Sequence, residues 1–381
     1  MRVHTVRRFP HRVRPRAARD AKTQRVTDLR TTLPTLALVV TTGAIGGWIA
    51  KQIGLPLPWM LGSLLTTSFI AVFIPRALPE TYKTPDLFRA AFIALIGVTI
   101  GAKVTWEVLV ELTNAVYSFI ALTLFVPLAQ WTNYLIFRKV GGYDRTTAFF
   151  CGTPGGLMEA MLLGEQQGAD VRLVTMQQFL RIICVVTMLP IGLSIWYGHP
   201  VGSAGGMTLS RAEAGLEHLP EVIFLAAAGL VFSHWMKLPA GQLVGPLLVG
   251  AVVTIAGLAV IEVPGWMISA AQVVIGSTLG ARFIGINAAL IMRGVGLSAL
   301  SVASMLIIGG LFAAIVHPLA GEPFDVLLIS FSPGGVTEMA LIALSLQANP
   351  AFVTTHHIYR ILLTVAVMTW SMKKVLMRDP D

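Results

Sequence analysis

Two short motifs in this chain place a proline, two glycines and a glutamate at the same spacing inside apolar sequence. The residues are Pro154, Gly155, Gly156 and Glu159 in the first motif, and Pro333, Gly334, Gly335 and Glu338 in the second. Proline removes a backbone donor and glycine loosens a helix, so each motif predicts a helix break with free backbone groups. In apolar surroundings such groups are tolerated only against protein or a water-filled cavity, and paired breaks are typical of solute or ion sites.

Charged residues accompany both motifs. Glu159 and Glu338 stand where a new helix is expected to begin, and there the helix dipole favours a carboxylate. Arg181 and Arg360 each follow their glutamate by 22 residues. Because a lone charge inside an apolar segment is costly, we expect glutamates and arginines to approach one another. The alternatives are a helix-capping glutamate and an arginine that reaches the interface.

Other polar residues in apolar runs are secondary candidates. Thr99 and Thr278 lie between glycines, a pattern that favours close helix packing over ligand contact, and Gln272 is a lone polar residue. Adjacent His356 and His357 point about 100° apart on a helix and cannot share one metal. The other histidines lack metal-site spacing, and no phosphate-binding loop is present. We therefore expect no metal and no cofactor.

The composition indicates which elements must position these residues. Of 381 residues, 55% are hydrophobic and 12% are charged, and the mean hydropathy is +0.74. Soluble chains carry about 25% charged residues. Several runs hold no charge and approach the roughly 20 residues that a membrane-crossing helix needs: 33–50, 54–75, 112–137, 238–261, 263–281 and 294–316. They lack the alternation of a barrel, so we predict an all-α polytopic integral membrane protein.

The motifs belong to a longer internal duplication. Three blocks and one arginine recur in the same order: Leu55-Pro56 and Leu238-Pro239, Gly97–Lys103 and Gly276–Arg282, the two Pro-Gly-Gly motifs, and Arg181 and Arg360. The first pair is offset by 183 residues and the others by 179. We predict two tandem homologous helical repeats, residues 32–198 and 219–376, joined by a linker at 199–218.

The topology is argued from the positive charges. Between Arg145 and Glu159 there are 13 uncharged residues, and between Asp325 and Glu338 there are 12, too few to cross a bilayer. If both motif segments are re-entrant, each half crosses five times, the repeat is inverted and there are about ten crossings. Arg138, Lys139, Arg145, Arg282 and Arg293 then face the cytoplasm, as the positive-inside rule favours. The alternative is a parallel repeat of six crossings.

Residues 1–31 form a basic tail, with ten arginines and lysines against Asp20 and Asp28. A cytoplasmic anchor touching anionic lipid is favoured, and a nucleic-acid-binding arm or a transit peptide is the alternative. With residues 377–381 as a second tail, we predict a multi-pass protein of the bacterial inner (cytoplasmic) membrane with both termini in the cytoplasm. The expected partners are the bilayer and a small solute, without nucleic acid. Self-association stays an open alternative.

The duplicated blocks resemble those of the AbrB-type membrane protein family. The resemblance covers nearly all of the chain after the tail, and it implies a duplicated membrane domain. Some family members are labelled ammonia monooxygenases and others are linked to gene regulation. The resemblance therefore adds two functional classes to the one that the broken helices favour.

Three functions are left open. The first is a secondary transporter of a small solute with its site at the broken helices, with proton coupling through Glu159 and Glu338 as one version. The second is a membrane-embedded regulator of gene expression. The third is an ammonia monooxygenase-like enzyme, which is disfavoured because a copper site would need clustered imidazoles. The duplication, the breaks and the charges in apolar sequence favour the transporter over an enzyme.

Overall fold

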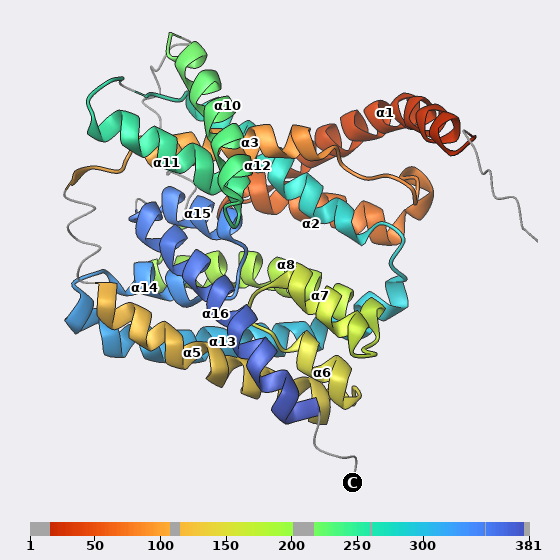
Figure 1. The fold of residues 1–381 in the computed structure, drawn as a ribbon, viewed down its shortest axis with the longest axis vertical. Coiled ribbons are helices and arrows are strands. Elements are labelled where there is room, and N and C mark those ends of the chain that lie inside the picture. The colour runs from red at the N-terminus through yellow and green to blue at the C-terminus, as the bar shows by residue number, and fades with distance from the viewer. Residues whose placement is uncertain (1–15, 107–114, 201–216, 260, 347, 377–381) are drawn as a thin grey trace, which may run out of the picture.

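The computed structural model describes residues 16–106, 115–200, 217–259, 261–346 and 348–376, with only the backbone described for 16–31 and 373–376. Every regular element in these ranges is a helix (Figure 1). Residues 1–15 of the basic tail, most of the predicted linker and the tail at 377–381 lie outside the described residues.

The helices follow one another in the same order in both halves of the chain. The first half contains α1 (Arg16–Gln52), α2 (Pro58–Phe73), α3 (Asp86–Gly101), α5 (Val116–Leu135) with a π-helical end (Ile136–Val140), α6 (Arg145–Cys151), α7 (Leu157–Gln166) and α8 (Val171–Tyr197). The second half contains α10 (Leu219–Met236), α11 (Gly241–Ile255), α12 (Gly265–Gly280), α13 (Ala288–Ala320), α14 (Phe324–Phe331), α15 (Val336–Ser345) and α16 (Pro350–Leu376). Both ends of α12, α15 and α16 lie 179 residues after those of α3, α7 and α8.

The helices form two bundles, and each bundle takes helices from both halves (Figure 1). We call the upper one in the figure, α1–α3 with α10–α12, the panel bundle. In it α11 packs against α3 and α10, and α12 packs against α2. The lower one, α5–α8 with α13–α16, is the break bundle, in which α13 packs against α5 and α8. The boundary between the sequence halves is therefore not a boundary in space.

Glycines bring the helices of the panel bundle into backbone contact. Gly97 and Gly101 of α3 lie against the backbone of α11, and Gly276 and Gly280 of α12 lie against α2. A Cβ atom at any of the four would approach a carbonyl oxygen more closely than real Cβ atoms do. The small residues that the two halves share in sequence thus join the third helix of each half to the second helix of the other.

Within the described residues, six helices are long and apolar enough to cross a membrane: residues 32–52, 116–140, 171–197, 219–236, 288–320 and 350–372. Their outward faces are apolar as well. On α13, Ile307, Leu311 and Ile315 are each more than 60% exposed and follow one another at helical spacing. Such a stripe is favourable only against lipid or another apolar surface. The chain is a helical membrane protein.

Candidate functional site

Both predicted breaks are present. Helix α6 ends at Cys151 and α7 begins at Leu157, and we call residues 152–156 the first break. Helix α14 ends at Phe331 and α15 begins at Val336, and residues 332–335 are the second break. All of these residues except the partly buried Gly335 are buried. Gly156 caps α7 with φ of 62°, a left-handed conformation that glycine adopts without strain, so the breaks place backbone polar groups inside the protein.

Arg360 of α16 lies between the two breaks. It is fully buried, and its guanidinium donates to the carbonyl oxygens of Ser332 and Gly334 in the second break. It also faces the first break, because a Cβ atom on Gly155 would lie 3.9 Å from Arg360 Nε. The same point would lie 3.2 Å from Thr364 Oγ1, one turn further along α16. One buried cation therefore binds the second break and faces Gly155 of the first.

Arg181 of α8 has the corresponding place in the first half. It is buried, and its Nη1 donates to the carbonyl oxygen of Thr153 in the first break. Its charge is close enough to Arg360 for the two groups to repel one another. Each arginine thus binds the break of its own half, from the second helix after that break, and both lie against the first break.

The glutamates take a different place from the one we expected. Glu338 is 5% exposed and Glu159 is partly buried, each in the first turn of the helix after its break. Neither forms an ion pair within 4 Å of Arg181 or Arg360 in the part of the chain that the structure describes. The free carbonyl groups of the breaks are the nearer acceptors, so the arginines bind backbone oxygen instead of carboxylate.

Two further polar positions complete the site: Gln178, and His357, which we considered from the sequence only as a metal ligand. Gln178, three residues before Arg181, donates from Nε2 to the Phe150 carbonyl at 2.8 Å and to Thr153 Oγ1 at 2.7 Å. His357 is the matching residue 179 positions later. It is fully buried, and both of its ring nitrogens are without a hydrogen bond. A polar residue three positions before each arginine was a signal that the repeat alignment could have revealed.

We expect His357→Gln to raise the unfolding free energy by about 1 kcal/mol. The glutamine would stand where Gln178 stands in the first half, within reach of the end of α14, and would replace two unpaired buried nitrogens. Melting temperatures in one detergent measure the effect, with His356→Gln as the matched control. His356 already has partners in Ser118, at 2.7 Å, and the Phe352 carbonyl. A lower melting temperature for His357→Gln would contradict the expectation.

Polar contacts also connect the two halves within the break bundle. Ser301 of α13 donates to Asn133 Oδ1 of α5 at 2.7 Å. Ser298 of α13 donates to Gln177 of α8, and Ser118 of α5 is bonded to His356 of α16. In each case the partners come from different halves. In an apolar setting such bonds fix the position of one helix along the other. They therefore also fix the position of the first break relative to the second.

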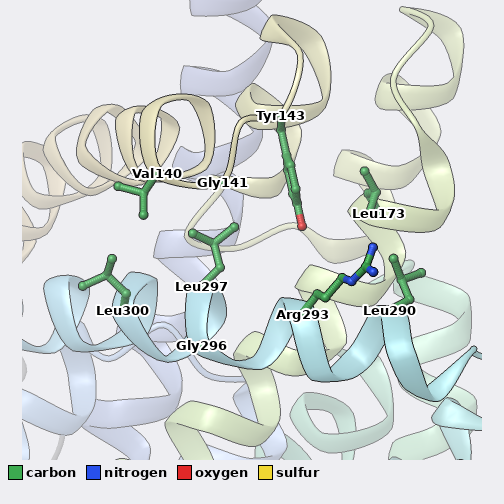
Figure 2. Close-up of a pocket in the computed structure, with 9 residues that line it drawn as sticks. All are labelled: Val140, Gly141, Tyr143, Leu173, Leu290, Arg293, Gly296, Leu297 and Leu300. Atoms are coloured by element: carbon green, nitrogen blue, oxygen red, sulfur yellow. The ribbon is translucent and has the colours of Figure 1, made fainter.

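A groove of about 500 Å³ lies beside the break bundle (Figure 2). Most of its lining is apolar, but the Tyr143 hydroxyl and the Arg293 guanidinium point into it from opposite sides (Figure 2). Burial raises the pKa of Tyr143, so its hydroxyl stays protonated at neutral pH. Gln177 Nε2 donates to this hydroxyl at 2.8 Å, while the next residue, Gln178, binds the first break. The groove is therefore linked to the break through α8.

The three secondary candidates lie in the panel bundle, away from the breaks. The hydroxyl of Thr99 donates to the Leu95 carbonyl at 2.8 Å, and that of Thr278 donates to the Ile275 carbonyl at 3.1 Å, so each satisfies its own helix. Gln272 is buried in α12. The structure thus gathers the Pro-Gly-Gly motifs and the arginines in one place and leaves these three residues outside it.

Comparisons with known proteins agree on one family. A family model described as "Transition state regulatory protein AbrB" matches residues 59–375, which include both breaks. A Bacillus subtilis (strain 168) protein, "Uncharacterized protein YhjN", is 28% identical over 353 residues, covering 86% of this chain and 90% of that protein. "Putative regulator AbrB" of Escherichia coli (strain K12) is 25% identical over 322 residues, covering 80% and 92%.

Proposed function

The chain belongs to the AbrB family, and we propose that it is a secondary transporter of a small solute in the bacterial inner membrane. The observation that carries the proposal is the position of Arg360, which is fully buried, binds the backbone of the second break and faces Gly155 of the first. A charge in a membrane bundle is costly, and it is retained where it serves a pathway or a site. Broken helices at matching places in two halves are the usual setting of a transporter's solute site.

The two bundles suggest how access to the site would alternate. Both breaks belong to the break bundle, and the panel bundle has continuous helices packed closely through glycine. Between α11 and α16, one from each bundle, lies a cavity of about 280 Å³ with a mostly apolar lining. Because this interface between the bundles is incompletely filled, it has less van der Waals packing energy. Less packing energy is therefore lost when the bundles slide past one another. In the proposed cycle the break bundle moves against the panel bundle and carries the site with it.

In the proposed topology the repeat is inverted. The six long helices and the shorter α2, α3, α11 and α12 make ten crossings, and α6–α7 and α14–α15 are re-entrant. A 16-residue helix such as α2 spans about 24 Å, less than the roughly 30 Å of a bilayer core. The membrane is therefore expected to be thinner around the panel bundle. The matching helix bounds support the duplication, and the positive charges support the inversion.

The topology predicts opposite exposure for the π-helical end of α5 and for the turn before α14. In a protein lacking Cys151 and Cys184, Lys139→Cys is expected to be protected from an impermeant maleimide in intact cells, and Pro323→Cys is expected to react. Both positions are exposed in the structure, so the membrane decides the outcome. Lysed cells provide the control, because both sites should then react. Labelling of Lys139→Cys in intact cells with protection of Pro323→Cys would exclude the inverted topology.

The transport mechanism is tested by locking the bundles together. Val104, Ala251 and Ala351 form a small contact cluster, with Ala251 on α11 and Ala351 on α16. A short, reducible bis-thiol cross-linker between Ala251→Cys and Ala351→Cys is expected to stop solute-induced currents of the protein in liposomes, and reduction should restore them. Each single-cysteine protein with the same reagent is the control. Full activity in a cross-linked protein would contradict movement between the bundles.

Regulation of gene expression is the second candidate, and it is favoured by the description of the matched family and by the name of the Escherichia coli relative. Helix α1 has 37 residues and is about 55 Å long, so it extends well beyond a bilayer toward the basic tail. Deleting residues 2–30 separates the two candidates. Transport should survive the deletion, whereas a regulator that signals through its tail should lose its effect.

A further inference from the structure

We propose that the transported solute is a small oxyanion, held between the breaks by Arg181 and Arg360. This inference names the substrate class of the proposed transporter and rests on that function for its physiological role. The binding itself can be tested without transport.

The first argument is charge. Both guanidinium groups are buried in the break bundle, and both lie against the first break, Arg181 at Thr153 and Arg360 beside Gly155, where like charges repel. Throughout the described ranges, no carboxylate lies within 4 Å of either group. Carbonyl dipoles compensate a buried cation only in part, so two such cations close together are unfavourable. The Glu159 and Glu338 carboxylates each lie beside the last glycine of their break but do not pair with the arginines. An anion between the two guanidinium groups would remove the repulsion and add a direct counter-charge, whereas a cation would add a third like charge.

The second argument is the set of unused donors. Arg181 Nη1 is bonded to Thr153, but its Nε is buried without a partner. Arg360 uses both terminal nitrogens on the second break, and its Nε is also unpartnered. The hydroxyl of Thr364 is also buried without a hydrogen-bond partner. Buried donors normally have acceptors. Arginine commonly binds a carboxylate or a similar oxyanion through two hydrogen bonds from its Nε side, and this side of Arg181 is free.

The third argument is where these donors lie. Thr364 Oγ1 and Arg360 Nε both face the point where Gly155 lacks a Cβ atom, at 3.2 Å and 3.9 Å. Helices α7 and α15, each of ten residues, begin directly after the breaks. Their N-terminal ends carry partial positive charge and free N–H groups. Two unpartnered donors of α16 thus lie against Gly155 of the first break, close to the first turns of α7 and α15.

The proposal is tested by binding to the purified full-length protein. Melting temperatures are measured in sodium formate, acetate or nitrate against sodium chloride of equal ionic strength, with ammonium chloride as the cation probe. We expect a saturable rise with at least one oxyanion. Affinity should fall about tenfold or more in Arg181→Gln, because a charged hydrogen-bonding group is lost. Thr364→Val changes the same site with little change of shape and should also weaken binding. Arg172→Gln, an exposed arginine nine residues before Arg181 on α8, is the matched control.

Two results would overturn the anion site. The first is the absence of a saturable rise with every oxyanion. The second is a rise that is unchanged in both Arg181→Gln and Thr364→Val. Flux measurements in liposomes keep this inference apart from the proposed function. Saturable oxyanion binding without flux leaves the site standing and overturns the transporter. Flux of ammonium, with no oxyanion binding, supports the transporter and overturns the anion.

Discussion

An Arg360→Lys protein is expected to insert into the membrane and to bind an oxyanion probe such as acetate roughly 10–150-fold more weakly. Arginine at this position binds two carbonyl oxygens of the second break and still presents Nε toward the first. Lysine keeps the charge, but its three donors diverge from one atom and cannot occupy the three places of the guanidinium. A factor of that size corresponds to the loss of one charge-assisted hydrogen bond, about 1.5–3 kcal/mol.

Arg181→Lys is the matched comparison. Arg181 binds one carbonyl oxygen, that of Thr153, where Arg360 binds two. We therefore expect a smaller loss of affinity and a smaller drop in melting temperature than for Arg360→Lys. Saturation curves from thermal shifts or from currents in liposomes give both values. If the two lysine variants behave alike, the position of Arg360 between the breaks has no special role.

Gly155→Val is expected to abolish oxyanion binding while leaving membrane insertion intact. The new Cβ atom would lie 3.2 Å from Thr364 Oγ1 and 3.9 Å from Arg360 Nε, and the two methyl groups would fill the remaining space before these donors. Gly155→Ala adds the Cβ alone, so its loss of oxyanion affinity should be intermediate between those of the unchanged protein and Gly155→Val. Insertion is measured by the yield of monodisperse protein after solubilisation, and binding by thermal shift.

Two other glycines serve as controls for this prediction. At Gly334 a side chain would meet Met339, whose flexible thioether can move. Gly334→Val should therefore weaken oxyanion binding less than Gly155→Val does. Gly296 on α13 has open space where its Cβ would lie, and valine there should change binding little. Normal binding by Gly155→Val would mean that the first break does not contribute to the site.

The sequence was sufficient to predict the long helices and the two breaks, because both depend on local properties. Uncharged runs near 20 residues leave a membrane helix as the simplest structure. Pro154 and Pro333 are each followed by two glycines, a combination that disfavours a continuous helix, whereas a single proline such as Pro127 lies inside a helix. The repeat then indicated that the breaks and the arginines belong together, and the structure does place Arg181 and Arg360 against them.

The partners of the charges could not be predicted in the same way. We expected carboxylates beside the arginines because opposite charges attract. The breaks, however, offer carbonyl oxygens at positions that depend on how each helix ends, and these hold Arg181 and Arg360. The packing of each half's third helix on the other half's second helix could not be predicted from the sequence either. By its sequence, α3 could have packed on α2 of its own half as well as on α11. Sequence pattern describes which faces are small and apolar, but not which of several similar faces meet.

The packing of α3 on α11 has a consequence for biosynthesis. Gly97 of α3 packs against Leu243 of α11, which is made 146 residues later. At the usual 5–20 residues per second, α3 emerges roughly 7–30 seconds before the surface that covers it. During that interval the glycine face of α3 contacts only lipid, water or the insertion machinery. The first half made alone should therefore be a target for membrane proteases, and supplying the second half as a separate polypeptide should protect it.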